Sequence, residues 1–141
     1  MKLGGMVLII DSSIDIALLI DLRIKHDFSD YSTAIADCPK KALELIKQFK
    51  EQIVAIIIEV VLPVCKECID LNIKNGVELL AATSRLDNIR PISVIFFTSQ
   101  ERHKYEKILE THPWKEKIIW VEKPDWPLFL EKLKEVLRNQ S

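Results

Sequence analysis

The sequence predicts an α/β fold, a three-layer α/β/α sandwich built around a five-stranded parallel sheet. Short apolar runs alternate along the chain with longer segments of helical periodicity. One run, residues 53–58, is Ile-Val-Ala-Ile-Ile-Ile, which is too apolar for a strand with one face in water. It predicts a central strand that is covered on both faces. Parallel strands need crossover helices, and those crossovers are right-handed, so the helices should lie on both sides of the sheet.

The N-terminal half is expected to supply three strands and two helices. The strands are Met6–Ile10, the weaker Tyr31–Ala36 and the central Ile53–Ile58. Capping side chains at 11–13 introduce the first helix, whose helical spacing is carried by Ile14, Ala17, Leu18, Asp21, Leu22 and Lys25. Pro39 suits the first turn of the second helix, which has one apolar stripe of Ala42, Leu43, Ile46 and Phe49.

The C-terminal half is expected to supply the remaining two strands. Pro63 ends the central strand, an irregular stretch follows, and a helix opens at Val77. The later strands are Ile92–Phe97 and Ile118–Val121, separated by a charged helical segment at 100–111. The last helix is expected to be capped by Asp125 and to be built on Leu128, Phe129, Leu133, Val136 and Leu137.

Length and composition limit the function classes. The chain has 141 residues, 48% of them hydrophobic, which suits one domain spanning 1–141 with a core of its own. Twenty basic residues against 21 acidic ones give a net charge of −1, so nucleic-acid binding is not expected. No apolar segment approaches the roughly 20 residues of a membrane span. Three cysteines, an odd number, favour a reducing compartment, so we expect a cytoplasmic protein.

Polar side chains follow the strands at their carboxyl ends. Ligand sites of open parallel sheets lie at that edge, beside the point where the strand order reverses. The rule selects Asp11, Ser12, Glu59, Thr98 and Lys123. Two carboxylates, two hydroxyls and one ammonium are therefore expected to converge.

Four sequence marks in this order resemble the receiver domain of bacterial two-component response regulators. They are Val7–Asp11, Ile56–Glu59 with Pro63 four residues on, Pro91 through Thr98, and Lys123-Pro124. The resemblance spans about residues 5–138. It implies the flavodoxin-like strand order 2-1-3-4-5 and a role in signal transduction by phosphorelay.

The resemblance also implies a role for each polar position. Glu59 stands at the phosphoacceptor position, and Asp11 and Ser12 stand at the acidic pair that helps to hold Mg²⁺. Thr98 and Lys123 stand at the positions that contact the phosphoryl oxygens.

Trp120, three residues before the lysine position, matches the aromatic that changes rotamer on activation in the family. Simple packing of Trp120 against the fourth or fifth helix is the plainer alternative. Trp114 and Trp126 flank the same strand, so the helix 4–strand 5–helix 5 face is expected to be rich in aromatic residues. In the family, that face mediates docking or a homodimer.

Two site positions depart from the family pattern. Glu replaces Asp at 59 and Ser replaces an acid at 12. One extra methylene shifts the carboxylate by roughly an ångström, and such a misplacement costs on the order of 10²-fold in phosphoryl transfer. Mg²⁺ remains compatible with Asp11 and Glu59, although one charge is missing. We hypothesise that Glu59 reaches Lys123 directly and holds the site in one arrangement, so that no resident cofactor is expected.

The spacing after the central strand also departs from the family. Gly76, which opens the third helix, lies 17 residues past Glu59, farther than in the family, so we expect an insertion at about 64–75. It contains Cys65 and Cys68. A structural zinc site needs four ligands and a redox pair favours a helix N-terminus, so an ordinary variable loop is the main interpretation.

These observations predict a stand-alone, receiver-like protein, a pseudo-receiver, that is not an enzyme and acts by protein–protein interaction. Its partner is expected to be a histidine kinase or a downstream signalling protein, with neither nucleic acid nor membrane involved. The chain ends just after the last predicted helix, so no output domain is expected. Two alternatives stay open: a phosphoryl-accepting response regulator under Mg²⁺-dependent control, and a small thiol-redox or flavodoxin-like electron carrier. Acids after the first strand, where a flavin phosphate would sit, argue against the flavin alternative.

Overall fold

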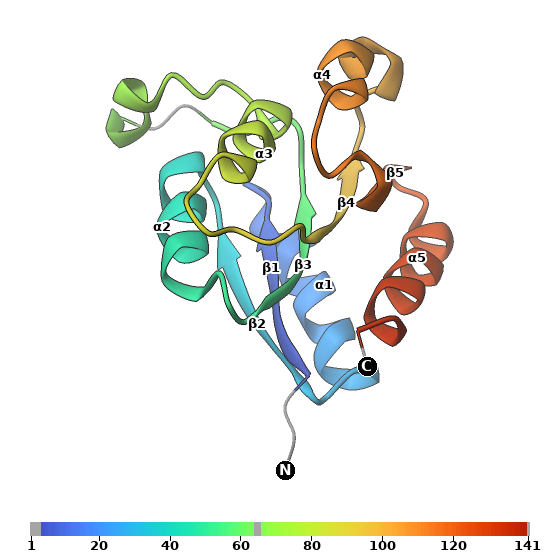
Figure 1. Cartoon of the computed structure of the whole chain (residues 1–141). Coiled ribbons are helices and arrows are strands. Elements are labelled where there is room, and N and C mark those ends of the chain that lie inside the picture. Colours follow the sequence, from blue (N-terminus) through green and yellow to red (C-terminus); the bar gives the residue numbers. More distant parts are fainter. Residues whose placement is uncertain (1–3, 64–65, 141) are drawn as a thin grey trace.

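A parallel sheet organises the residues that the computed structural model describes, which are 4–63 and 66–140 (Figure 1). The strands in this described part are β1 (Gly5–Ile10), β2 (Tyr31–Ala36), β3 (Ile53–Ile58), β4 (Ser93–Thr98) and β5 (Ile118–Glu122). Their order across the sheet is β2-β1-β3-β4-β5, and every neighbouring pair is parallel. The predicted fold class and strand order are confirmed.

Helices cover both faces of the sheet. The α-helices are α1 (Ile14–Asp27), α2 (Pro39–Phe49), α3 (Gly76–Ser84), α4 (Glu106–Glu110) and α5 (Trp126–Arg138). Short 3₁₀ turns are η1 (Lys66–Leu71), η2 (Arg102–Tyr105) and η3 (Lys115–Lys117). α1 and α5 lie on one side of the sheet, and α2 and α3 lie on the other (Figure 1).

Two apolar layers form the core, one on each face of the sheet. In β1, Val7 and Ile9 belong to the layer under α1 and α5, whereas Leu8 and Ile10 belong to the opposite layer. Successive side chains of a strand point to opposite faces. Every position of a central strand therefore meets apolar atoms, which explains why β1 and β3 are apolar throughout instead of alternating.

The predicted first helix is present as α1, and one of its sides packs on the sheet. Ala17, Ile20 and Ile24 face the sheet and are almost fully buried, whereas Leu18 and Leu22 are exposed. The helix carries two apolar stripes, and periodicity alone does not say which one packs inward. The smaller side chain of Ala17 suits close approach to the strands.

The segment around α4 is less helical than predicted. Residues 100–111 were expected to form one charged helix, but η2 is a 3₁₀ turn and α4 has only five residues. Trp114 is buried, so it does not contribute to an exposed aromatic face as expected. Asp125 caps α5 as predicted, because its side chain accepts a hydrogen bond from the N–H of Leu128.

The insertion after β3 contains η1 and leads to α3. Cys65 and the side chain of Cys68 lie outside the described residues, so the expectations for this pair stay predictions. Across the described part of the chain, no helix combines the length and the apolar character that crossing a bilayer requires.

Candidate functional site

Three charged side chains meet at the carboxyl edge of the sheet. Asp11 follows β1, Glu59 follows β3 and Lys123 follows β5. Lys123 Nζ donates hydrogen bonds to Asp11 Oδ2 at 3.0 Å and to Glu59 Oε1 at 2.9 Å. We call these three residues the charged cluster. The direct contact expected between Glu59 and Lys123 is present.

Backbone hydrogen bonds fix the three Cα positions of the cluster. Each residue donates its main-chain N–H to a carbonyl at the end of a neighbouring strand. The bonds are Asp11 to Ala36 (3.0 Å), Glu59 to Ile10 (2.9 Å) and Lys123 to Thr98 (2.8 Å). Parallel pairing therefore brings residues 64 and 112 positions apart in sequence into contact.

The second oxygen of each carboxylate is also occupied. Asp11 Oδ1 accepts the N–H of Ser13 at 2.9 Å. Glu59 Oε2 accepts the N–H of Val60 at 2.6 Å and, less closely, that of Val61 at 3.4 Å. The longer Glu side chain thus turns back onto the amides that follow its own strand. All four carboxylate oxygens accept a hydrogen bond from the protein itself.

Burial strengthens these interactions. The side chains of Asp11, Glu59 and Lys123 are 6%, 9% and 18% exposed. Burial by itself lowers the pKa of Lys123, but the hydrogen bonds to Glu59 and Asp11 and the two negative charges outweigh it and raise this pKa. The cluster carries a formal charge of −1, and the backbone amides on both carboxylates stabilise that remaining charge.

Gly76 allows α3 to approach the end of β3. Its N–H donates to the Val60 carbonyl at 2.7 Å. A Cβ at this position would lie 2.2 Å from the carbonyl oxygen of Glu59, which no side chain tolerates. The absence of a side chain at position 76 therefore lets the start of α3 pack directly against the backbone of Glu59.

Ser12 and Thr98 stand beside the cluster without touching its charges. Ser12 is exposed, and among the described residues its hydroxyl takes no part in the hydrogen bonds around Lys123. Thr98 is fully buried, and its Oγ1 accepts the N–H of Gln100 at 3.1 Å. Its carbonyl, not its hydroxyl, contacts Lys123. The hydroxyl of Thr98 thus stabilises the turn after β4.

Trp120 is tied to the same turn. Its indole N–H donates to the Gln100 carbonyl at 3.1 Å. The ring is stacked between Phe96, at 4.9 Å, and Tyr105, at 5.9 Å between centroids. Gln100 therefore bonds to Thr98 through its N–H and to Trp120 through its C=O. Trp120 thus packs against Phe96 of β4 and Tyr105 of η2, directly before α4, and its role as a switch aromatic stays a prediction.

In the arrangement described, the carboxylate oxygens of the charged cluster are not free for Mg²⁺. A magnesium ion needs carboxylate oxygens that are free to complete an octahedral shell. Here Asp11 Oδ2 and Glu59 Oε1 are bound to an ammonium, and Ser12 offers no carboxylate. Among the described residues there is also no group of three or more metal-ligating side chains.

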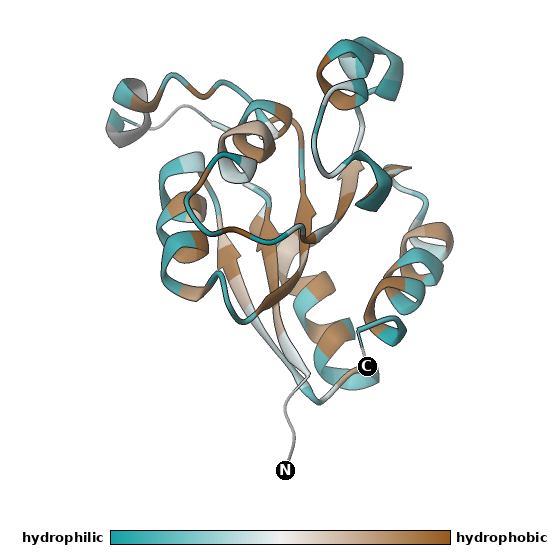
Figure 2. Ribbon diagram, in the orientation of Figure 1, coloured by the Kyte–Doolittle hydropathy of each residue, from teal (hydrophilic) through white to brown (hydrophobic). Residues whose placement is uncertain are grey.

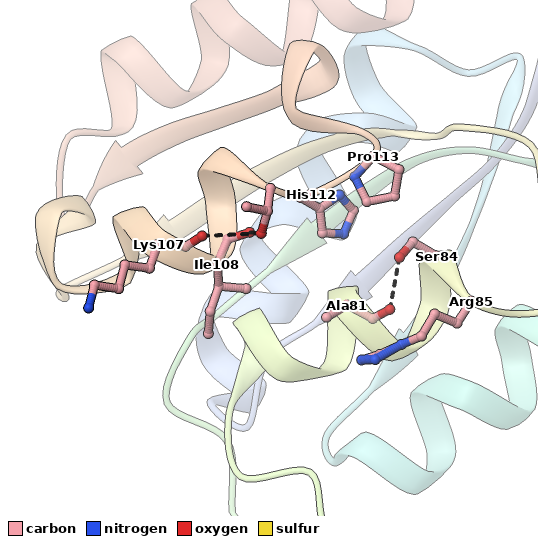
Figure 3. A pocket seen from close by; sticks show the side chains of 8 residues that line it. Ala81, Ser84, Arg85, Lys107, Ile108, His112 and Pro113 are labelled. Carbon is pink, nitrogen blue, oxygen red and sulfur yellow. Dashed lines mark hydrogen bonds between the residues drawn. The ribbon is translucent and has the colours of Figure 1, made fainter.

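A cavity of about 430 Å³ lies apart from the cluster, between α3 and α4 (Figure 3). Its lining includes Arg85, Ile108 and His112, and none of the cluster residues. Both ring nitrogens of His112 face the backbone: Nδ1 accepts the N–H of Trp114 at 2.9 Å, and Nε2 lies 3.3 Å from the carbonyl oxygen of Leu80. His112 therefore joins α3 to the segment before β5 and is a structural residue.

Sequence reasoning missed the backbone part of the site. The amides of Ser13, Val60 and Val61 bind the carboxylates, and no residue type marks such donors in a sequence. The capping signal at 11–13 pointed to Ser13, whose side chain caps α1, but not to its amide.

Several solved structures that match this chain are response-regulator or receiver-domain proteins. The chemotaxis protein CheY4 of Vibrio cholerae matches with a TM-score of 0.73 and 20% identity, over 94% of this chain and 98% of that one. A two-component response regulator from Clostridium difficile matches with a TM-score of 0.69 and 19% identity, over 95% and 96%. The BeF₃-activated receiver domain of Klebsiella pneumoniae RstA gives 0.67 and 15%, over 95% and 99%.

This chain has the receiver fold. Because the identities are only 15–20%, these matches establish the fold alone. No protein-family model and no curated protein sequence matches the chain. The charged cluster lies at the carboxyl edge of the sheet, where ligand sites of open parallel sheets are expected. The roles that the resemblance assigns to Asp11, Ser12, Glu59, Thr98, Lys123 and Trp120 stay predictions.

Proposed function

We propose that this protein is a receiver-like signalling protein of the two-component type that acts by binding another protein, without normal phosphorylation at position 59. The observation that carries the proposal is the ammonium of Lys123 held between Asp11 and Glu59. Lys123 already has carboxylate partners without a phosphoryl group, and the two carboxylates already have a cation without Mg²⁺.

The chemistry of phosphoryl transfer supports this proposal. The reaction depends on an attacking oxygen placed in line and on cations that neutralise the transferred group. Both oxygens of Glu59 are engaged, one by Lys123 and the other by the amide of Val60. A phosphoryl group at Glu59 would have to displace these bonds and would lack a well-held metal.

The surroundings of the cluster are also held in one arrangement. Trp120 is bonded and stacked, and Thr98 is bonded to the same turn. We therefore infer that a partner recognises a constant surface. That partner is a histidine kinase or a downstream signalling protein, and we assign the protein no catalytic role and a cytoplasmic location. A homodimer through the α4–β5–α5 face stays a prediction.

Acetyl phosphate with Mg²⁺, followed by intact-protein mass spectrometry, tests the proposal. The wild type should show no phosphoryl adduct under conditions that label a known receiver domain. The matched variant is Ser12→Asp/Glu59→Asp, which supplies the acidic pair and the shorter acceptor. It should gain the adduct, because the shortened carboxylate releases Lys123. An adduct on wild-type Glu59 would favour the phosphoryl-accepting alternative instead.

A further inference from the structure

The outer face of α1 is apolar. The exposed side chains are Ile14 (60%), Leu18 (46%), Leu19 (53%) and Leu22 (63%). They are four of the seven large hydrophobic side chains that the described residues expose. Ile14, Leu18 and Leu22 follow each other at intervals of four and so form one ridge along the helix. We call these four residues the α1 face.

The α1 face continues into a hollow beside α5. A cavity of about 260 Å³ is lined by Leu19, Arg23, Trp126 and Leu130. α1 and α5 lie on the same side of the sheet (Figure 1), and apolar segments run along α1 (Figure 2). Leu19 therefore belongs both to the α1 face and to the lining of this hollow.

The charges of α1 match a second copy in the antiparallel direction. Asp15 lies in the first turn, and Arg23 and Lys25 lie near the other end, where they also pair within the helix with Asp27 at 3.7 Å and with Asp21 at 3.0 Å. The side chains of Arg23 and Lys25 are still 48% and 63% exposed, so both cations can meet a further carboxylate. An antiparallel copy places each Asp15 at the level of the other copy's Arg23 and Lys25, and it also opposes the two helix dipoles. A parallel copy would instead place like charges at the same level.

The spacing fits a two-fold axis as well. An axis that passes α1 near residue 20 brings Leu18 of each copy against Leu22 of the other copy. A two-fold interface uses one patch twice and must be complementary to itself. The α1 face meets this condition both in apolar contact and in charge.

We propose that the α1 face is the interface of a homodimer in which α1 packs antiparallel against α1 of a second copy. The four side chains offer on the order of 400 Å² of apolar surface per copy, within the range of functional patches. A standard stable interface buries about 800 Å² per partner, so we expect a weak dimer. This proposal does not depend on the state of the charged cluster.

Analytical ultracentrifugation of the full chain, from about 1 µM to about 300 µM, brackets a micromolar Kd. The wild type should change from monomer to dimer within this range. Leu22→Glu should remain monomeric. Leu71→Glu is the matched control, because it places the same charge on an exposed apolar residue of η1, outside both the α1 face and the α4–β5–α5 face, and it should dimerise like the wild type. Circular dichroism checks that each variant is folded.

Charge reversal tests the antiparallel direction. Asp15→Lys and Arg23→Glu should each weaken the dimer by about tenfold. An equimolar mixture of the two variants should recover wild-type affinity, since both contacts then pair opposite charges. A wild type that is monomeric at the highest concentration would overturn the proposal and leave the face to a different protein. A dimer that tolerates Leu22→Glu, or variants whose mixture does not associate, would also overturn it.

Discussion

Removal of the Lys123 ammonium is the most informative perturbation of the charged cluster. Lys123→Met keeps the length of the side chain and removes its charge. Two carboxylates, 6% and 9% exposed, would then lie close together without a cation. Breaking a buried ion pair by deleting one partner costs about 3–5 kcal/mol. We expect a loss of unfolding free energy near that range, measured by urea denaturation at neutral pH.

Two comparisons show whether the loss comes from the buried charges. Arg90→Met removes the guanidinium bound to Glu51 at 3.0 Å, but both side chains are exposed, at 82% and 63%, so this variant should lose less than about 1 kcal/mol. Adding Glu59→Gln to Lys123→Met should restore part of the stability, because one uncompensated charge disappears. If Lys123→Met costs no more than Arg90→Met, the electrostatic account of the cluster is refuted.

Three further predictions concern the surroundings of the cluster. Glu59→Asp shortens the side chain by roughly an ångström, which breaks the 2.9 Å contact with Lys123. Millimolar Mg²⁺ should then raise the melting temperature of this variant and not that of the wild type, and equal shifts would contradict the account. Gly76→Ala should lower the unfolding free energy by about 1–3 kcal/mol, because its Cβ would lie 2.2 Å from the Glu59 carbonyl oxygen; an unchanged urea midpoint would count against this close approach. The pKa of His112 is lowered mainly by burial and also by the nearby charge of Arg85. The folded protein therefore resists protonation of His112, and the unfolding free energy should fall as the pH drops below about 6.5. His112→Gln should flatten that pH dependence, and identical slopes for variant and wild type would refute it.

The sequence was sufficient to predict the sheet and the edge where the cluster lies. β-Branched runs set the strands, and the rule that sites lie at carboxyl strand ends selected Asp11, Glu59 and Lys123. The contact between Glu59 and Lys123 was also predictable, because a buried charge needs a partner. These inferences depend on residue type and on strand order, which a sequence records directly.

The remaining features depend on geometry that residue types do not encode. The buried side of α1 was not predictable because the helix has two apolar stripes, and packing against β1 selects the one with Ala17 and Ile20. The amides of Val60 and Val61 became ligands of Glu59 only through the direction of the chain after β3. The segment 100–111 lacked a clear stripe, so its charge and polarity suggested more helix than forms.

A crystal structure of the protein grown with Mg²⁺ and beryllofluoride tests the central claim most directly. Our account predicts that Lys123 Nζ stays within hydrogen-bond distance of both carboxylates, near 3.0 Å from Asp11 Oδ2 and 2.9 Å from Glu59 Oε1, with neither ion bound between them. A magnesium ion coordinated by Asp11, or a beryllofluoride group on Glu59 with Lys123 turned toward it, would contradict the account.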